Sequence, residues 1–183
     1  MNGGPSDAEV IARVLGGDTE LFGILVDRYQ DEFARYAKYM TGSEDDAADV
    51  IQDSLVRAYR SLRRCGDPES FKGWLFRIVS NQCKTHLARR RRRRLEPLAD
   101  EAEEVPSSAD PAADAEGADL RRKVHQALQE LPTDQREALV LKYVEELSLP
   151  EMARLLSASV SALKMRLLRG RRELLAKLQG VLT

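Results

Sequence analysis

The chain has 183 residues, a formal net charge of −1 and a hydrophobic fraction of 43%. This length allows one ordinary domain or two small ones, and glycine, proline and β-branched residues are too few and scattered for many short strands. No apolar run approaches the roughly 20 residues that a membrane span needs. The composition therefore favours a mostly helical protein and excludes a transmembrane helix.

The small net charge conceals an acidic segment between two basic ones. Residues 1–94 carry a net charge of +3, residues 95–119 of −9 and residues 120–183 of +5. Six consecutive arginines, Arg89 to Arg94, stand directly before the acidic segment. Because a binding partner responds to the local field, each segment has to be interpreted separately.

The acidic segment divides the chain into two domains. Residues 95–118 are rich in Ala, Glu, Asp, Pro and Ser and contain no aromatic residue, so they cannot bury enough apolar surface to become ordered. We expect a flexible, self-repelling linker over 95–118 between small helical domains at 10–94 and 119–180. The predicted fold class is all-α.

Three long helices are predicted in the first domain. Apolar residues recur at steps of three and four over residues 21–40, and Gly42 then ends this helix. Ser43 caps a second helix over residues 44–62, whose first turn is acidic. A third helix begins near Phe71 and ends in the arginine run.

The second and third helices each have a charged face opposite their apolar stripe. The second helix presents Asp45, Asp46, Asp49, Gln52 and Asp53, and the third presents Lys72, Arg77, Asn81 and Lys84. Charged residues in this position are usually just solvated, so the faces alone leave partner binding open. In the arginine run, the repulsion among six cations is larger than the stabilisation that the C-terminal end of a helix dipole gives them. The run therefore favours a phosphate partner.

The second domain ends in a predicted helix-turn-helix. Residues 120–131 form a helix stopped by Pro132, and the next helix starts with Thr133 as its expected cap. Ser148 and Glu151 have capping-box spacing before a short helix, and Ser159 caps a long basic one. A helix fits the major groove, where its first turns meet base edges and later cations meet phosphates.

Three runs in this order carry a resemblance to a known family. They are SEDDAADVIQDSLVRAYRSL, then FKGWLFRIVSNQCKTHLARRRR, then LPTDQREALVLKYVEELSLPEMARLLSASVSALKMRLLRGRREL. Together they resemble bacterial RNA polymerase sigma factors of the extracytoplasmic-function group in the sigma-70 family. The resemblance implies a region 2-like helical bundle and a region 4-like helix-turn-helix. It also implies an alternative sigma factor that binds core RNA polymerase, recognises minus-ten and minus-thirty-five elements and helps to melt DNA.

The resemblance also assigns residues to partners. The acidic face at Asp45, Asp46, Asp49, Gln52 and Asp53 corresponds to the surface for the β′ coiled coil of the polymerase. The minus-ten DNA-binding set is Lys72, Trp74, Arg77, Asn81, Lys84, Arg89, Arg90 and Arg91. The minus-thirty-five set is Ser161, Lys164, Met165, Arg166, Leu168, Arg169 and Arg171.

The chain departs from the family pattern at several positions of the helix-turn-helix. Ser157 stands where the turn often has glycine, so either Ser157 carries left-handed strain or the turn itself differs from the family's. Ala162 replaces a common threonine and removes a hydroxyl that contacts phosphate. Met165 and Leu168 are apolar, so they can touch a thymine methyl group but form no hydrogen bond with a base.

The implied partners are core RNA polymerase, through the β′ coiled coil and the β subunit, promoter DNA, and an anti-sigma factor. We expect no membrane insertion, a monomer when free, and a cytoplasmic location, with retention at the membrane only through the anti-sigma factor. No catalytic residue, cofactor or metal is predicted. Cys83 and His86 form a C-x-x-H pair, but Cys65 and His125 are the only further candidate ligands, so buried inert thiols are the better interpretation.

Two other function classes remain open at this point. One is a helix-turn-helix transcriptional regulator that does not join the polymerase, although such a regulator usually dimerises and no heptad seam is present. The other is a helical adaptor that binds RNA or protein. A further hypothesis is that the acidic linker folds back on the basic surfaces and lowers unproductive DNA binding.

Overall fold

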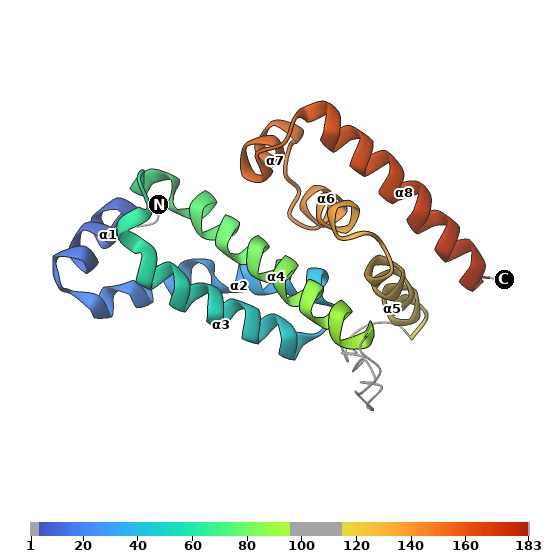
Figure 1. Ribbon diagram of the computed structural model, residues 1–183, viewed down its shortest axis with the longest axis horizontal. Helices are drawn as coiled ribbons and strands as arrows, with labels where there is room; N and C mark the ends of the chain where they lie inside the picture. The colour runs from blue at the N-terminus through green and yellow to red at the C-terminus, as the bar shows by residue number, and fades with distance from the viewer. Residues whose placement is uncertain (1–3, 96–114, 183) are drawn as a thin grey trace.

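The computed structural model describes residues 4–95 and 115–182 (Figure 1). Within them, the elements are α1 (Asp7–Gly16), η1 (Thr19–Leu21), α2 (Phe22–Thr41), α3 (Glu44–Ser61), η2 (Leu62–Arg64), η3 (Pro68–Ser70), α4 (Phe71–Leu95), α5 (Ala115–Gln129), α6 (Thr133–Tyr143), α7 (Leu149–Leu156) and α8 (Val160–Leu182). These parts of the chain contain α-helices and 3-10 helices but no strand, which confirms the all-α prediction.

The first domain is the bundle α1 to α4, and its helix ends follow the predicted signals. Gly42 adopts a left-handed conformation with φ of 85° and ends α2. The Ser43 side chain then accepts a hydrogen bond from the backbone N–H of Asp46 at 3.3 Å, which caps α3. An added Cβ at Gly42 would lie 2.7 Å from the Gln129 side chain, so this turn also meets the second domain closely.

The core of the first domain contains the predicted apolar stripes and some further positions. Phe33 and Tyr36 of α2 pack against Phe76 of α4 with ring centroids 6.0 and 4.7 Å apart. Phe76 and Ser80 are buried although they lie outside the predicted stripe of this helix. Helix α4 therefore has two buried faces, one toward α2 and α3 and one toward the second domain.

The second domain, α5 to α8, contains the predicted helix-turn-helix in α7 and α8. Ser148 and Glu151 form the capping box of α7, and the Ser159 side chain accepts from the N–H of Ala162 at 3.1 Å. Ser157 ends α7 in a left-handed conformation with φ of 50°, which is the first of the two alternatives expected for this turn. The prediction for Thr133 was wrong, because Thr133 is the first residue of α6 and no side chain caps this end.

The linker prediction extended too far at its C-terminal end. Helix α5 starts at Ala115, although 95–118 were predicted to be flexible and the helix was expected from residue 120. The predicted linker residues 96–114 lie outside the described residues. The hypothesis that they fold back concerns these residues and stays a hypothesis.

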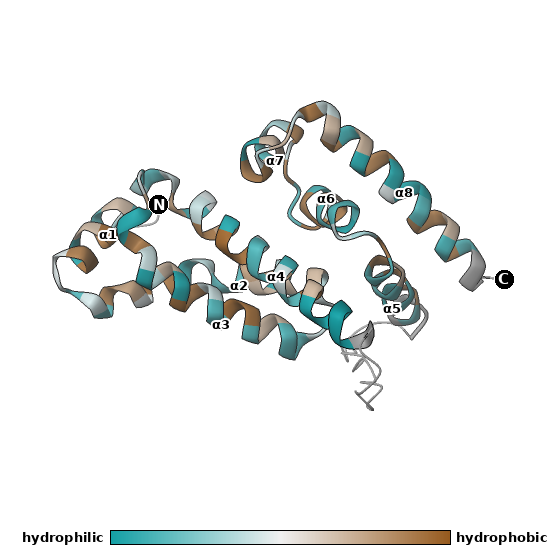
Figure 2. Cartoon of the chain, viewed as in Figure 1, coloured by the Kyte–Doolittle hydropathy of each residue, from teal (hydrophilic) through white to brown (hydrophobic). Residues whose placement is uncertain are grey.

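The two domains pack directly against each other. Helices α5 and α6 contact α2, and α7 contacts α4, while α8 runs along the outer edge of the molecule (Figure 1). The buried apolar side chains of both domains form one continuous cluster. Hydrophilic residues gather toward the end of α4, and hydrophilic and hydrophobic residues alternate along α8 (Figure 2).

Candidate polymerase-binding and DNA-binding surfaces

The acidic face of α3 lies on the outside of the first domain. Asp45, Asp49, Gln52 and Asp53 are exposed, because the stripe of Ala47, Val50, Ile51, Ser54 and Ala58 turns the opposite side of the helix into the core. Asp45, Asp49 and either Gln52 or Asp53 stand three or four residues apart, so the members form one strip along the helix. This strip offers several carboxylates to a basic partner.

Asp46 differs from the other members of the acidic strip. Its carboxylate lies 3.2 Å from Nε2 of His86 and 3.3 Å from the guanidinium of Arg90. Arg90 also donates a hydrogen bond to the carbonyl of Thr41 at 3.3 Å. This part of α4 is thereby fixed to the junction of α2 and α3, and Asp46 and Arg90 are partly engaged within the domain.

Two apolar residues that the sequence interpretation missed continue the acidic strip. Val56 is 43% exposed and Tyr59 is 42% exposed, and they follow Asp53 at steps of three residues. The Tyr59 ring packs edge-on against Phe22, with centroids 5.2 Å apart. The signal was present in the sequence, because these residues occupy the exposed side of the same helical period, where a purely solvated face would be polar.

The outward side of α4 carries the predicted minus-ten residues, but several already have protein partners. Lys72 forms an ion pair with Glu32 of α2 at 2.8 Å. Arg77 donates a hydrogen bond to the carbonyl of Arg154 in α7 at 3.1 Å, and Lys84 lies 2.8 Å from the carboxylate of Glu137 in α6. Asn81 is exposed on the same helix. Two cations of this helix, Arg77 and Lys84, are therefore bound by groups of the second domain.

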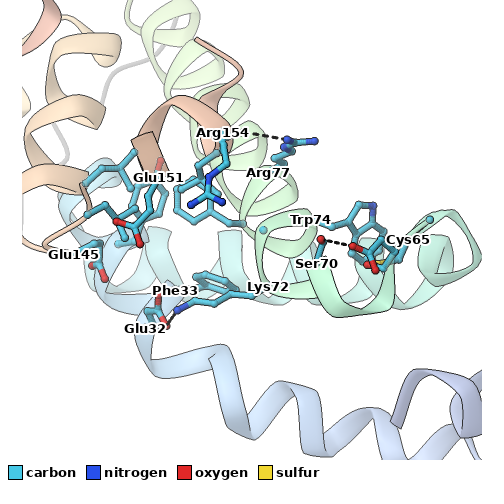
Figure 3. A pocket seen from close by; sticks show the side chains of 18 of the residues that line it. Glu32, Phe33, Cys65, Ser70, Lys72, Trp74, Arg77, Glu145, Glu151 and Arg154 are labelled. Carbon is cyan, nitrogen blue, oxygen red and sulfur yellow. Dashed lines mark hydrogen bonds and ion pairs between the residues drawn. The ribbon is translucent and has the colours of Figure 1, made fainter. Parts of the chain in front are cut away.

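Trp74 borders a cleft between the start of α4 and the second domain (Figure 3). The cleft has a volume of about 680 Å³, and its walls are mostly apolar. Trp74 is half-buried and packs on Phe71, with centroids 5.7 Å apart. The loop before α4 is held by Asp67, which accepts from the N–H of Glu69 at 3.1 Å and from the Ser70 hydroxyl. A structured loop beside an aromatic ring and a cleft can hold an unstacked base.

The arginine run continues α4 as a regular helix. Arg89, Arg91, Arg92 and Arg93 are exposed, whereas Arg90 points to Asp46. Arg91 and Arg92 also line a second cleft of about 500 Å³, which Lys84 and Arg166 share from the two domains. The end of α4 is therefore a concentrated positive surface.

The exposed side of α8 contains most of the predicted minus-thirty-five residues. Ser161, Lys164, Met165, Leu168, Arg169 and Arg171 are exposed. Leu163 and Leu167 anchor the helix in the domain core, and they are 0% and 7% exposed. Arg166 is half-buried and lies 3.5 Å from Asp134 of α6, so its guanidinium is partly directed to the protein.

The cysteine and histidine residues are dispersed. Cys65 and Cys83 are both free and buried. Burial raises the pKa of Cys83 to about 12 and also raises the pKa of Cys65, which keeps both thiols protonated. Burial lowers the pKa of His125, which packs beside Tyr39. Within residues 4–95 and 115–182 no group of three or more His, Cys, Asp or Glu side chains is placed to hold a metal ion.

The long helices of the described chain are all too polar to cross a membrane.

Comparison with known families and proteins identifies both domains. Residues 25–93 match the model of sigma-70 region 2, and residues 121–174 match the model of sigma-70 region 4. The chain is 30% identical to the ECF RNA polymerase sigma-E factor of Haemophilus influenzae, over 97% of each chain. It is 33% identical to the RNA polymerase sigma-H factor of Pseudomonas aeruginosa, over 96% of this chain and 95% of the relative.

Solved structures give the same result. CnrH in complex with the cytosolic domain of CnrY matches with a TM-score of 0.68 and 30% identity, covering 96% of this chain and 99% of that one. The sigma factor RpoE of Bartonella quintana in complex with the anti-sigma factor NepR matches in fold, with a TM-score of 0.65 and 23% identity over 86% and 96% of the two chains. The chain therefore belongs to the extracytoplasmic-function group of the sigma-70 family and is an alternative sigma factor that directs promoter-specific transcription initiation.

Proposed function

We propose that this sigma factor uses three surfaces in turn: the acidic strip of α3 for core polymerase, the basic side of α4 for the minus-ten element, and the exposed side of α8 for the minus-thirty-five element. The observation that carries this proposal is the placement of the three surfaces. Each lies on its own helix, opposite that helix's buried stripe, and has the charge that its partner requires.

The acidic strip docks on the β′ coiled coil. Asp45, Asp49 and Asp53 supply negative charge, and Val56 and Tyr59 supply apolar area at the end of the strip. Protein interfaces with a buried apolar part and a charged rim combine affinity with orientation. The two exposed apolar side chains support this assignment, because a surface that faces only solvent would be polar at these positions.

The basic side of α4 binds and opens the minus-ten element. Arg89, Arg91 and their neighbours contact phosphates, while Trp74 and the loop before it face the strand separation point. Extruding a base costs a few kcal/mol, and capture in a pocket beside an aromatic ring offsets this cost. Recognition and melting are thereby coupled in one step.

The exposed side of α8 reads the minus-thirty-five element in the major groove. Lys164 and Arg169 offer hydrogen-bond donors to base edges, and Met165 and Leu168 offer apolar contacts for thymine methyl groups. Arg171, one turn further, contacts phosphate. Arg166 has a smaller role in this scheme because Asp134 already engages it.

The activity requires no reaction centre in the protein. A sigma factor is an initiation subunit, and we assign no catalytic residue, cofactor or metal to it. It acts as a monomer in the cytoplasm, where core polymerase and promoters are found. We also assign it an anti-sigma factor as regulator, in view of the two structural relatives solved with partner proteins, one of them named an anti-sigma factor.

Run-off transcription tests the proposal. Purified core polymerase, with and without the protein, transcribes a pool of templates with random upstream sequences, and the transcribed templates are sequenced. We expect protein-dependent transcripts that share two short elements at a fixed spacing. Duplex DNA binding without polymerase binding or transcription would instead support a regulator that does not join the polymerase.

Charge reversal on α3 tests the docking surface separately. Asp49→Lys with Asp53→Lys should lower the affinity for core polymerase about tenfold or more, because like charges across an interface cost several kcal/mol. Asp27→Lys with Asp31→Lys is the matched control, since both residues are exposed on α2 of the same domain and the change in net charge is the same. An equal loss from the control would show that net charge, and not the strip, determines binding.

A further inference from the structure

The cleft of about 500 Å³ lies where α4 meets α6 and α8. The first domain lines it with side chains of α4, among them Lys84, Arg91 and Arg92, and the second domain contributes the first turns of α6 and Arg166 of α8. Small-molecule sites usually have about 300–1,000 Å³ and a few convergent polar groups. The cleft therefore has the size of such a site and is lined by both domains.

The buried carboxylate in this lining, Glu137, is already bound by the protein. Glu137 is 1% exposed. The Ser80 hydroxyl donates to its Oε1 at 2.6 Å, the Tyr36 hydroxyl donates to the same oxygen at 3.0 Å, and Nζ of Lys84 lies 2.8 Å from Oε2. Because Lys84 and Glu137 neutralise each other, neither sets the charge that a ligand in the cleft would meet.

The second carboxylate of the lining, Asp134, is exposed and weakly paired. Its Oδ2 lies 3.5 Å from Nε of Arg166, and both side chains are open to solvent, so this ion pair adds little stability. A guanidinium group carries five N–H donors, and within the described residues Asp134 engages only the Nε of Arg166. Arg166 therefore keeps donors for a ligand.

Arg91 and Arg92 give the cleft its excess of positive charge. Both are exposed, and neither forms an ion pair within residues 4–95 and 115–182. The hydroxyl of Thr133 adds a neutral donor at the start of α6, an end that no side chain caps. With four cations and two carboxylates, the lining has a net charge of +2.

We propose that this cleft binds a short oligophosphate, a linear chain of two or three phosphate groups that is either inorganic or the tail of a nucleotide. Guanidinium groups bind phosphate oxygens through paired N–H donors. A chain of phosphates suits cations that approach from α4 and from α8 better than a single phosphate group does. Leu87 and Ala88 supply apolar contact for a nucleoside when the ligand is a nucleotide. This ligand is distinct from the promoter DNA of the proposed function.

The dimensions of the cleft favour a free oligophosphate over duplex DNA. A space of about 500 Å³ corresponds to a cube of about 8 Å on a side, which is narrower than the major groove of DNA at about 12 Å. A duplex therefore cannot enter the space between α4 and the second domain, whereas a linear triphosphate can.

Isothermal titration calorimetry of the full-length protein with sodium tripolyphosphate tests the site. At about 150 mM ionic strength the Debye length is about 8 Å, so distant charges have little effect. Arg91→Ala and Arg92→Ala should each raise the Kd about fivefold or more, because each removes charge-assisted hydrogen bonds. Arg93→Ala is the matched control, since Arg93 is exposed in the same run but does not line the cleft, and its Kd should stay within about twofold of the wild type.

Asp134→Asn provides a measurement in the opposite direction. Its Kd should fall about threefold or more, because the change removes a carboxylate that repels the ligand and that engages Arg166. Glu130→Gln is the matched control, the same charge change at an exposed carboxylate outside the cleft. A gain of affinity in Asp134→Asn cannot arise from unfolding.

ATP as a second probe distinguishes the two sources of the phosphate chain. A lower Kd for ATP than for tripolyphosphate assigns the site to a nucleotide, and an equal or higher one assigns it to an inorganic chain. The proposal is overturned if neither probe binds at about 1 mM, if Arg91→Ala and Arg92→Ala lose no more affinity than Arg93→Ala, or if Asp134→Asn binds no more tightly than Glu130→Gln. A labelled single strand of about 12 random nucleotides that depends on Arg91 and Arg92, with no binding of tripolyphosphate, would assign the cleft to DNA instead.

Discussion

Replacing Glu137 by alanine should lower the free energy of unfolding by about 3–5 kcal/mol, the usual effect of removing one partner from a buried charged pair. The structure indicates where this loss arises. Tyr36 and Ser80 are 0% and 3% exposed, and alanine leaves both hydroxyls without their acceptor, at about 1–3 kcal/mol each. The Lys84 side chain is 40% exposed, so its ion pair adds little, about 0–1 kcal/mol.

Urea unfolding, followed by far-UV circular dichroism and by fluorescence of Trp74, the only tryptophan, measures this loss. Glu137→Gln separates charge from hydrogen bonding, because its amide oxygen still accepts from both hydroxyls, and it should lose only about 1–2 kcal/mol. Glu130→Ala, at an exposed site, should stay within about 0.5 kcal/mol of the wild type. If Glu137→Ala behaved like Glu130→Ala, residue 137 would be solvated in the free protein and the packing of the domains would be refuted.

Three further outcomes are expected. Arg169→Ala should reduce discrimination for the minus-thirty-five element by about 1–3 kcal/mol in binding assays, while Lys177→Ala should not; equal losses on specific and scrambled DNA would make Arg169 a phosphate contact. Arg91→Ala and Arg92→Ala should each lower the salt slope of DNA binding by about one unit if each contacts one phosphate. The wild type should lose stability relative to Cys83→Ala as the pH rises from 9 toward 12. The unfolded thiol ionises near 9 and the folded thiol near 12, so only the unfolded state releases the proton between these pH values and is stabilised by it. Parallel curves of stability against pH for the two proteins would contradict this.

Local signals in the sequence predicted most of the fold. Gly42, Ser43, Ser148 and Ser159 mark helix ends through contacts within a few residues, and all four behave as predicted. Thr133 failed as a cap because Pro132 occupies the N-cap position, so that the threonine is already the first residue of the helix. Predictions of this kind succeed where the deciding interaction lies within one turn.

Burial that depends on the second domain was not predictable from periodicity. Ser80 lies off the apolar stripe of α4, and Glu137 has the sequence appearance of a solvated charge. Each becomes buried only because α4, α2 and α6 meet in space, a relationship between residues about 60 to 100 positions apart. The same limit explains why Lys84 was predicted to be available for DNA, although in the structure it faces a carboxylate of the other domain.

The contact between the two domains combines apolar packing with buried polar groups. A contact of leucines alone would hold the domains together but would expose a large apolar patch on separation, which promotes aggregation. The carboxylate of Glu137, the hydroxyls of Tyr36 and Ser80 and the ammonium group of Lys84 all regain water when the domains part, and this hydration offsets much of the lost interaction.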